Sequence, residues 1–146
     1  MNWVIEMDCE VLAKARKVLD STNSTCVFCN GEVIIVDKRR GVRPLLDLLE
    51  NEANVSKFAV ADKVVGKAAA YLYCLLGIGC LYARVISMPA LHVLENAGIP
   101  VEYDQLVQGI QNRDGNGPCP MESAVWDIEN PEEALIAIRE KLKQLT

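Results

Sequence analysis

Apolar residues recur along the chain at two spacings, which predict a mixture of helices and strands. Apolar positions three or four residues apart are typical of amphipathic helices, whereas short runs of β-branched and aromatic residues are typical of strands. The helical spacing covers residues 8–20, 44–51, 62–76, 87–97, 118–126 and 131–145. Strand-like runs cover residues 25–29, 32–36, 57–61, 80–86 and 100–103. From residue 57 to residue 103 the order is therefore βαβαβ, which favours parallel strands joined by helices.

Residues that begin or end helices and turns agree with these limits. The pair Asn30-Gly31 lies between the first two strand-like runs and predicts a β-hairpin. Side chains that cap a helix N-terminus, and glycines that end a helix, stand at most of the remaining boundaries. The predicted caps are Asp8, Asp62 and Ser87, and the predicted terminating glycines are Gly77 and Gly98.

Composition narrows the fold class and the range of partners. Of the 146 residues 51% are hydrophobic but only 5% aromatic, a mixture that suits helices packed on a buried sheet, so we expect an α/β protein. The length fits one domain spanning residues 1–146. The net charge of −5 argues against broad nucleic-acid binding, which needs a basic surface, and favours a small-molecule ligand.

The N-terminal residues lack a basic segment followed by a long apolar one, so we expect no signal peptide and a cytoplasmic location. The longest uncharged run lies between Lys67 and Arg84. Gly77 and Gly79 interrupt it, so we expect no membrane span.

The six cysteines predict neither disulfides nor a metal site. They lie mostly in apolar segments of a chain with no export signal, which favours buried free thiols. Cys26 and Cys29 have the spacing of a metal knuckle or a redox pair. However, they lie in a predicted strand, where positions three apart face opposite ways, and no second cysteine pair accompanies them.

The segment Val60–Ala70 holds the first group of candidate functional residues. Lys63 and Lys67 are four positions apart, so they share one face in a helix that begins at Asp62. Two cations near the positive end of a helix dipole are unfavourable unless an anion binds there, which predicts a phosphate or carboxylate ligand. Solvated lysines, with Asp62 paired to Lys67, are the simpler alternative.

The segment 115–122 holds the second group. Cys119 is the predicted N-cap of a short helix, with Pro120 at the first helical position and Glu122 at the third. Glu122 could reach back to its own N-cap as in a capping box, which is a purely structural role. Alternatively, the helix N-terminus and nearby lysines lower the pKa of the Cys119 thiol and make it a nucleophile.

Three further features carry weaker signals. His92 is the only histidine and lies within a predicted helix, where packing or surface roles are the commoner ones. Ser87 is explained as a helix cap. The basic segment 38–43 could meet a phosphate, but such a cluster is more often a solvated loop, which is the favoured explanation.

The two motifs, VADKVVGKAAA at 60–70 and NR through GPCPME at 112–122, resemble an uncharacterised family of bacterial and archaeal proteins. The family is a domain of unknown function with a cytidine-deaminase-like fold. The resemblance extends from the hairpin to Val125. It implies a three-layer α/β/α domain with a mixed central sheet of about five strands.

The sequence departs from the zinc deaminases at both metal-binding motifs. Those enzymes need a His or Cys two residues before a Glu at one helix start, and Pro-Cys-x-x-Cys at the next. Here Asp62-Lys63-Val64 stands at the first position and Ser87-Met88-Pro89-Ala90 at the second, so we expect no metal and no cofactor.

We therefore expect a zinc-independent small-molecule enzyme or ligand-binding protein that acts on an anionic ligand, such as a nucleotide-like or phosphorylated molecule. The alternative is a non-catalytic interaction or regulatory module that self-associates through the hairpin or a helix. The predicted catalytic residues are Cys119, Asp62, Lys63 and Glu122, and the predicted ligand-binding residues are Lys67, Ser87, Asn112, Arg113 and Gly117.

Overall fold

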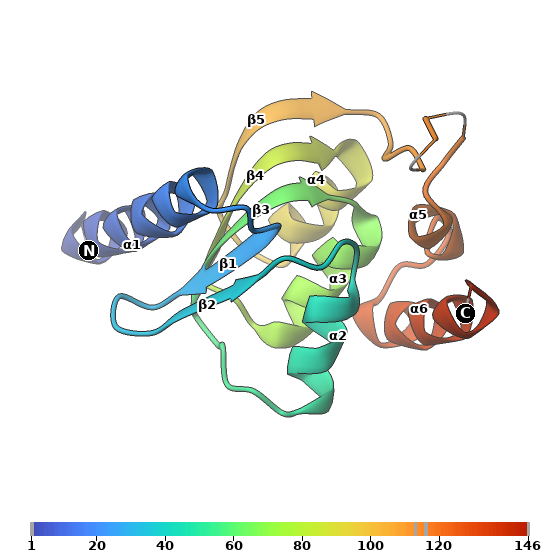
Figure 1. Ribbon diagram of the computed structural model, residues 1–146, viewed down its shortest axis with the longest axis horizontal. Helices are drawn as coiled ribbons and strands as arrows, with labels where there is room; N and C mark the ends of the chain where they lie inside the picture. The colour runs from blue at the N-terminus through green and yellow to red at the C-terminus, as the bar shows by residue number, and fades with distance from the viewer. Residues whose placement is uncertain (1, 113, 116, 146) are drawn as a thin grey trace.

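A five-stranded mixed sheet forms the centre of the molecule, with helices on both of its sides (Figure 1). The computed structural model describes residues 2–112, 114–115 and 117–145, with side chains from residue 10 onward. In chain order the elements are α1 (Asn2–Ser21), β1 (Cys26–Cys29), β2 (Ile34–Asp37), α2 (Arg43–Glu50), β3 (Ala59–Val65), α3 (Lys67–Leu76), β4 (Cys80–Ser87), α4 (Met88–Asn96), β5 (Val101–Val107), α5 (Pro120–Ala124) and α6 (Pro131–Leu145). The predicted α/β class is confirmed.

The strands lie in the order β2-β1-β3-β4-β5. β1 is antiparallel to both β2 and β3, whereas β3, β4 and β5 run parallel. Parallel neighbours need a crossover, which α3 and α4 provide, so the predicted βαβαβ order is confirmed. The carboxyl ends of the three parallel strands consequently lie side by side at one end of the sheet.

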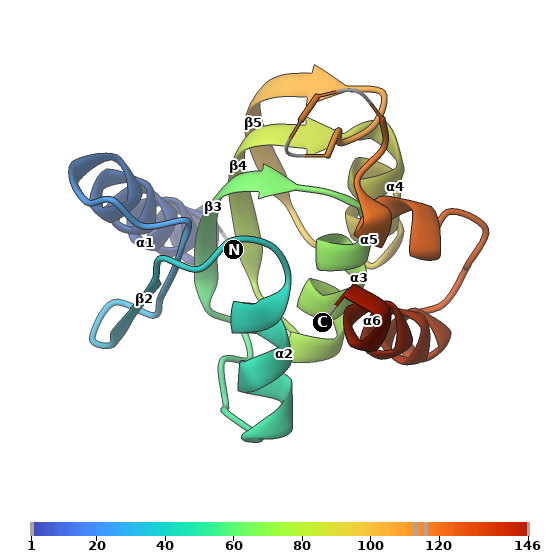
Figure 2. The same ribbon diagram turned by 45° about the vertical axis from the view of Figure 1, so that its right-hand side comes forward.

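The two faces of the sheet bury separate apolar cores. Figure 2 shows α1 on one side of the strands and α2 to α6 on the other. The large core, on the side of α3 and α4, includes Phe28, Val60, Leu72, Leu94 and Ile138. The small core, beneath α1, includes Leu12, Leu19, Val27, Ala61 and Tyr82. Cys26 belongs to the large core and Cys29 to the small one, so the two thiols face opposite ways as predicted.

One boundary prediction is wrong in a way that changes the site. β3 continues to Val65 and α3 begins only at Lys67, so Asp62 and Lys63 lie in a strand rather than in the first turn of a helix. Gly66, in extended conformation, is the N-cap of α3. The β-branched residues Val64 and Val65 favour the strand conformation, which explains why the helix begins later.

Three other boundaries differ from the sequence-based expectation. α1 begins at Asn2, so Asp8 lies within the helix and is not its cap. The hairpin connection is longer than a two-residue turn, because the Asn30 side chain accepts hydrogen bonds from the N–H groups of Glu32 (2.9 Å) and Val33 (2.7 Å). β5 extends to Val107, beyond residue 103, where the predicted strand ends. Where predicted, Ser87 caps α4 and Gly77, with a φ of 69°, ends α3.

The alternation of side chains between the two faces is broken near the ends of β3 and β4. Asp62 is bonded to Tyr73 of the large core, and Val65, three positions later, belongs to the same core. Ala83 and Ile86 in β4 repeat this spacing. Strict alternation would put positions three apart on opposite faces, so in both strands the alternation slips by one residue here, while the register between β3 and β4 stays unbroken. Among the helices in the described part of the chain, none has both the length and the apolar character needed to cross a bilayer.

Candidate functional site

The carboxyl group of Glu122 is buried against the N-terminus of α3. Cys119 is the N-cap of α5 and Pro120 its first residue, as predicted. Glu122 is only 2% exposed, and its Oε1 accepts a hydrogen bond from the backbone N–H of Lys67, the first residue of α3. The predicted capping box within α5 is therefore wrong, because this side chain caps a different helix.

Gly66 leaves the space that this carboxyl group occupies. A Cβ atom at position 66 would lie 2.5 Å from Oε1 of Glu122 and 2.8 Å from its Cδ. The exposed N–H groups of a helix N-terminus and the helix dipole favour an anion. At α3 the protein itself supplies that anion.

The second carboxyl oxygen of Glu122 is the unusual feature of this site. Burial raises the pKa of Glu122, although the N–H groups of Lys67, Ala68 and Ile110 and the hydroxyl of Ser87 act in the opposite direction. Oε2 is buried and has no hydrogen-bond partner among the described residues. Buried polar atoms normally have a partner, so an unpartnered carboxyl oxygen requires an explanation.

Ser87 and Lys67 lie beside this carboxyl group, whose pKa the Ser87 hydroxyl and the Lys67 N–H both lower, and each also makes a contact elsewhere. Ser87 is fully buried, and its Oγ accepts the N–H of Ala90 at 3.3 Å, which caps α4. The Nζ of Lys67 donates to the carbonyl oxygen of Trp126 at 2.7 Å and lies 5.7 Å from the centre of the Tyr71 ring. Lys67 does not pair with Asp62, contrary to the structural alternative considered from the sequence.

Asp62 forms a separate buried cluster beneath α3. Its Oδ2 accepts the hydroxyl of Tyr73 at 2.5 Å, and its Oδ1 accepts the N–H of Val64 at 3.2 Å. Burial raises the pKa of Asp62 to about 6, while these hydrogen bonds and the N–H of Lys63 act to lower it. Burial, together with the nearby Asp62, also raises the pKa of the Cys26 thiol. Both carboxyl oxygens of Asp62 are thus satisfied.

The two lysines of the first motif do not share a helix face, because Lys63 lies in β3 and Lys67 in α3. Lys63 follows Asp62 along the strand, so its side chain leaves the sheet on the face opposite to the large core. Cys119 is half-buried and packs against the large core. The structure therefore brings Glu122, Lys67 and Ser87 together but leaves Lys63 on the other side.

The remaining predicted residues are in the loop before α5. The N–H of Asn112 donates to the carbonyl of Gly117 at 2.8 Å, and the N–H of Cys119 donates to the carbonyl of Ile110 at 2.8 Å. Arg113 lies outside the described residues. Of the weaker candidates, His92 is exposed on α4, and Arg39 of the basic segment is bonded to Asp37 and Asp47.

A hollow of about 530 Å³ lies at the carboxyl ends of β3, β4 and β5. Its lining combines three valines with a short polar segment: Val64, Val85, Val107, Gln108, Gly109, Ile110 and Gln111. Sequence reasoning missed it, because Val64 is 48% exposed only as a result of the slip in β3, and no spacing signals that slip. Ile110 joins the hollow to the site, since its backbone N–H lowers the pKa of Glu122.

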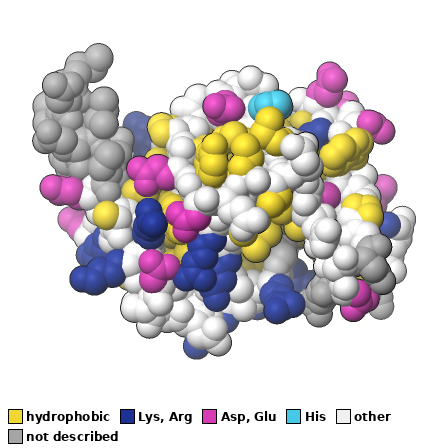
Figure 3. Space-filling view, turned by 90° about the horizontal axis from the view of Figure 1, so that it is seen from above, with side chains coloured by type: hydrophobic (Ala, Val, Ile, Leu, Met, Phe, Trp, Pro, Cys, Tyr) yellow, Lys and Arg dark blue, Asp and Glu magenta, His cyan; other side chains and the backbone are white. Residues whose placement is uncertain are grey.

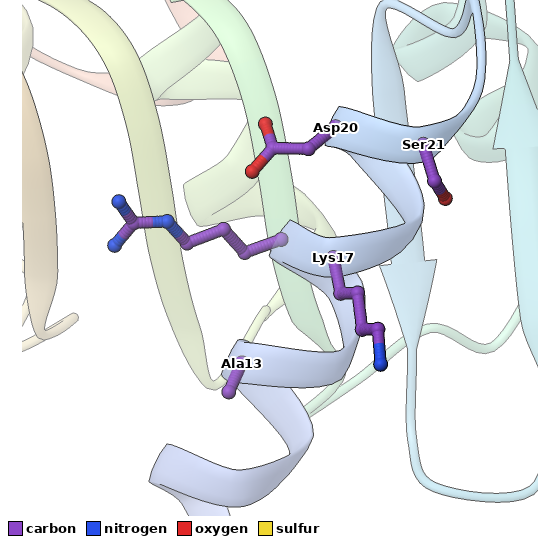
Figure 4. Close-up of a pocket in the computed structure, with 5 residues that line it drawn as sticks. Ala13, Lys17, Asp20 and Ser21 are labelled. Carbon is purple, nitrogen blue, oxygen red and sulfur yellow. The ribbon is translucent and has the colours of Figure 1, made fainter.

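A second hollow, of about 400 Å³, lies on the α1 side and is lined by residues of α1 (Figure 4). Asp20 is directed toward the sheet, where it pairs with Arg84 at 2.7 Å, while Lys17 points away. The guanidinium of Arg16 lies 4.2 Å from the centre of the Tyr82 ring and 3.5 Å from a carboxyl oxygen of Asp104. These contacts attach α1 to β4 and β5, which gives them a structural explanation.

Neither hollow has a ligand set for a metal ion. Within the described ranges, no three His, Cys, Asp or Glu side chains come together in a way that could hold one. Among the described cysteines, Cys26, Cys29, Cys74 and Cys119 are free thiols.

Comparisons with known proteins agree with the fold. The chain is similar to a DUF1893 family protein, TM1506, from Thermotoga maritima: the crystal structure of that protein superposes with a TM-score of 0.82 at 30% sequence identity, covering 92% of this chain and 90% of the other. No curated protein matches the chain. The family model described as a domain of unknown function, DUF1893 (TM1506), matches residues 14–142. On these grounds the chain belongs to the DUF1893 family.

Proposed function

We propose that this protein is a zinc-independent small-molecule enzyme or ligand-binding protein, and that the carboxyl group of Glu122 contacts the ligand. The observation that carries the proposal is the buried Oε2 atom without a partner. Leaving a buried carboxyl oxygen unsatisfied costs stability. A residue that must accept a hydrogen bond from a ligand, or exchange a proton with it, would justify that cost.

The position of Glu122 supports the same proposal. In sheets with parallel strands, ligands bind outside the carboxyl ends of the strands, where the N-termini of the following helices also lie. The hollow at the ends of β3, β4 and β5 has this position. Ile110, which lines this hollow, also has its backbone N–H close enough to Glu122 to lower the pKa of that carboxyl group.

The chemistry of the lining constrains the ligand. Val64, Val85 and Val107 offer an apolar floor, and the side-chain amides of Gln108 and Gln111 can each donate and accept hydrogen bonds. The proposed ligand therefore has an apolar body, polar edges, and a donor or weakly basic group that faces Glu122. An anionic group is less well supported, since Glu122 fills the N-terminus of α3 and the Lys67 ammonium is bonded to Trp126.

The proposal keeps a cytidine-deaminase-like fold, as the two motifs imply, but with a different helix start. In the zinc deaminases the first metal-binding motif lies at a helix start. Because α3 begins at Lys67, the residues at that helix start are Gly66-Lys67-Ala68 and not Asp62-Lys63-Val64. Glu122, from outside the βαβαβ unit, supplies the carboxyl group there. Glu122 is then the acid–base candidate, whereas Asp62 is fully hydrogen-bonded to the protein.

A second candidate function, a self-associating interaction module, is favoured by a different observation. Val33, Ile34 and Val36 are 40–48% exposed on or beside β2, an edge strand of the sheet. Exposed apolar residues on a sheet edge are typical of sites that pair with another chain.

Mass spectrometry under native conditions tests the ligand proposal. Protein purified gently from cells should carry a non-covalent small-molecule adduct that is lost from Glu122→Gln. The matched control is Glu133→Gln, at an exposed position on α6, which should keep the adduct. If the parent carries no adduct, or Glu122→Gln retains it at the parent level, the proposal is wrong.

A further inference from the structure

The β5 edge of the sheet is long, exposed and unprotected in the described part of the chain. β5 has seven residues and, among the described residues, pairs only with β4, so its other side presents backbone N–H and C=O groups to solvent. Residues 102–106 are all exposed, including Tyr103 at 42% and Leu106 at 38%. Figure 3 looks down on the side of the molecule where β5 lies and shows hydrophobic side chains interspersed with charged and polar ones.

We propose that two copies of this chain pair through their β5 edges, antiparallel, so that their two sheets become one continuous sheet. A contact between identical edges about a two-fold axis is closed and stops at a dimer. Pairing of β5 with the β2 edge of another copy would instead leave one free β2 and one free β5, and growth would continue. The occupant of the edge is therefore a second β5.

The charges on β5 disfavour two registers for this pairing. A two-fold axis normal to the sheet keeps each face of the sheet on its own side. Residues directly opposite each other must point to the same face, so the axis has to pass beside one residue, which then lies opposite the same residue of the partner. With the axis beside Asp104, the Asp104 carboxylates of the two copies would lie opposite each other. With the axis beside Tyr103, Glu102 of each copy would lie opposite the partner's Asp104. Like charges directly opposite each other destabilise a sheet, so both registers are unfavourable.

An axis at Gln105 avoids these contacts. It opposes Gln105 to the partner's Gln105, whose amides can hydrogen-bond to each other. It also opposes Tyr103 to the partner's Val107, and Asp104 to the partner's Leu106. No carboxylate then faces another carboxylate directly, and residues 103–107 of both copies are paired.

This register places the partner beside the hollow at the carboxyl ends of the parallel strands. Val107 and Gln108 line that hollow, and they would lie opposite the partner's Tyr103 and the partner's Glu102. Each hollow would thus gain a wall from the other copy. This last step rests on the proposed function, whereas the pairing of the β5 edges does not.

A charge exchange at the two-fold axis tests the pairing. Gln105 is exposed, so Gln105→Glu and Gln105→Lys should fold, as thermal melting can verify. Light scattering during gel filtration should give the parent a molar mass twice that of the 16.1 kDa chain. In each variant alone, two like charges at position 105 lie opposite each other at the axis, so the variant should run as a monomer. An equal mixture opposes Glu to Lys and should recover the doubled mass.

Two further variants separate this interface from the alternatives. Gln144→Glu makes the same substitution at an exposed position on α6 and should stay dimeric. Val36→Glu, on the β2 edge, should also stay dimeric, and loss of the dimer there would locate the interface on the hairpin instead. A monomeric parent, dimeric single variants or a mixture that stays monomeric would each overturn the proposal. All these masses are measured without ligand, so loss of the adduct in Glu122→Gln has no bearing on them.

Discussion

Asp62 and Glu122 are both buried carboxyl groups beside the large core, but their surroundings differ. Asp62 is 8% exposed, and each of its oxygens accepts a hydrogen bond from within its own β3–α3 unit. Glu122 is 2% exposed, with one oxygen at the N-terminus of α3 and the other without a partner in the described residues. The difference teaches that burial alone does not identify a functional carboxyl group. The unsatisfied oxygen is the more informative feature.

The comparison predicts a large loss of stability when the partner of Asp62 is removed. Tyr73→Phe leaves Oδ2 of Asp62 buried without a donor. The free energy of unfolding should fall by about 3 kcal/mol at neutral pH, because the group left unsatisfied is charged or forced to protonate. Urea denaturation measures this change.

Tyr82→Phe is a close control for that substitution. Tyr82 also donates its hydroxyl to an aspartate, Asp104, but the side chain of Asp104 is 53% exposed and water can replace the lost donor. The loss should be about 1 kcal/mol. Equal losses in the two variants would contradict the account of Asp62 as a buried, fully partnered group.

The space that Gly66 leaves for Glu122 predicts the next largest effect. In Gly66→Ala the new methyl group would meet the carboxyl group of Glu122, which must move and give up its bond to the N–H of Lys67. The expected loss is about 2 kcal/mol. Gly109→Ala, whose new Cβ would have no atom of the described residues within 4 Å, should be nearly neutral.

A double-mutant cycle sharpens this test. In a Glu122→Ala background the conflicting carboxyl group is absent, so Gly66→Ala should cost much less than in the parent. An unchanged cost would mean that the backbone at position 66, and not Glu122, requires glycine.

The raised pKa of Asp62 predicts how stability depends on pH. A carboxyl group whose pKa is higher in the folded state, here about 6, than in the unfolded chain binds its proton more tightly when folded. Its contribution therefore destabilises the fold above pH 6 and fades as the pH falls from about 6 toward 4. Comparing Asp62→Asn with the parent by denaturation at several pH values isolates this contribution. A parent and a variant with the same pH dependence would be inconsistent with the raised pKa.

Lys67→Ala should have the smallest effect. It removes the bond to Trp126 and the contact with the Tyr71 ring, at a cost of under about 1 kcal/mol. Phosphate should not raise the melting temperature of the parent, because Glu122 fills the N-terminus of α3. A rise with phosphate that is absent from Lys67→Ala would restore the anion site predicted from the sequence.

The sequence was sufficient for the order of the elements but not for the contacts of the candidate site. The terminating glycine Gly77, the cap Ser87 and the N-cap Cys119 all follow from local rules, and all are confirmed. Local rules failed at Asp62, which has the residue type of a cap, because Val64 and Val65 beyond Lys63 extend the strand.

Contacts between distant segments could not be predicted. Glu122 caps a helix that begins 55 residues earlier, and no periodicity within one segment encodes such a pairing. The exposure of Val64 depends likewise on the slip shared by β3 and β4. Both features require the packed structure.

A carbon-13 NMR titration of the two carboxyl groups tests the central claim most directly. Protein purified gently from cells would be compared with protein unfolded in urea, dialysed to remove any bound small molecule, and refolded. We expect the pKa of Glu122 to differ between the two samples and the pKa of Asp62 to stay the same, because a ligand would contact only the unpartnered oxygen. If neither value changes, or if only that of Asp62 does, Glu122 is not the group that faces a ligand.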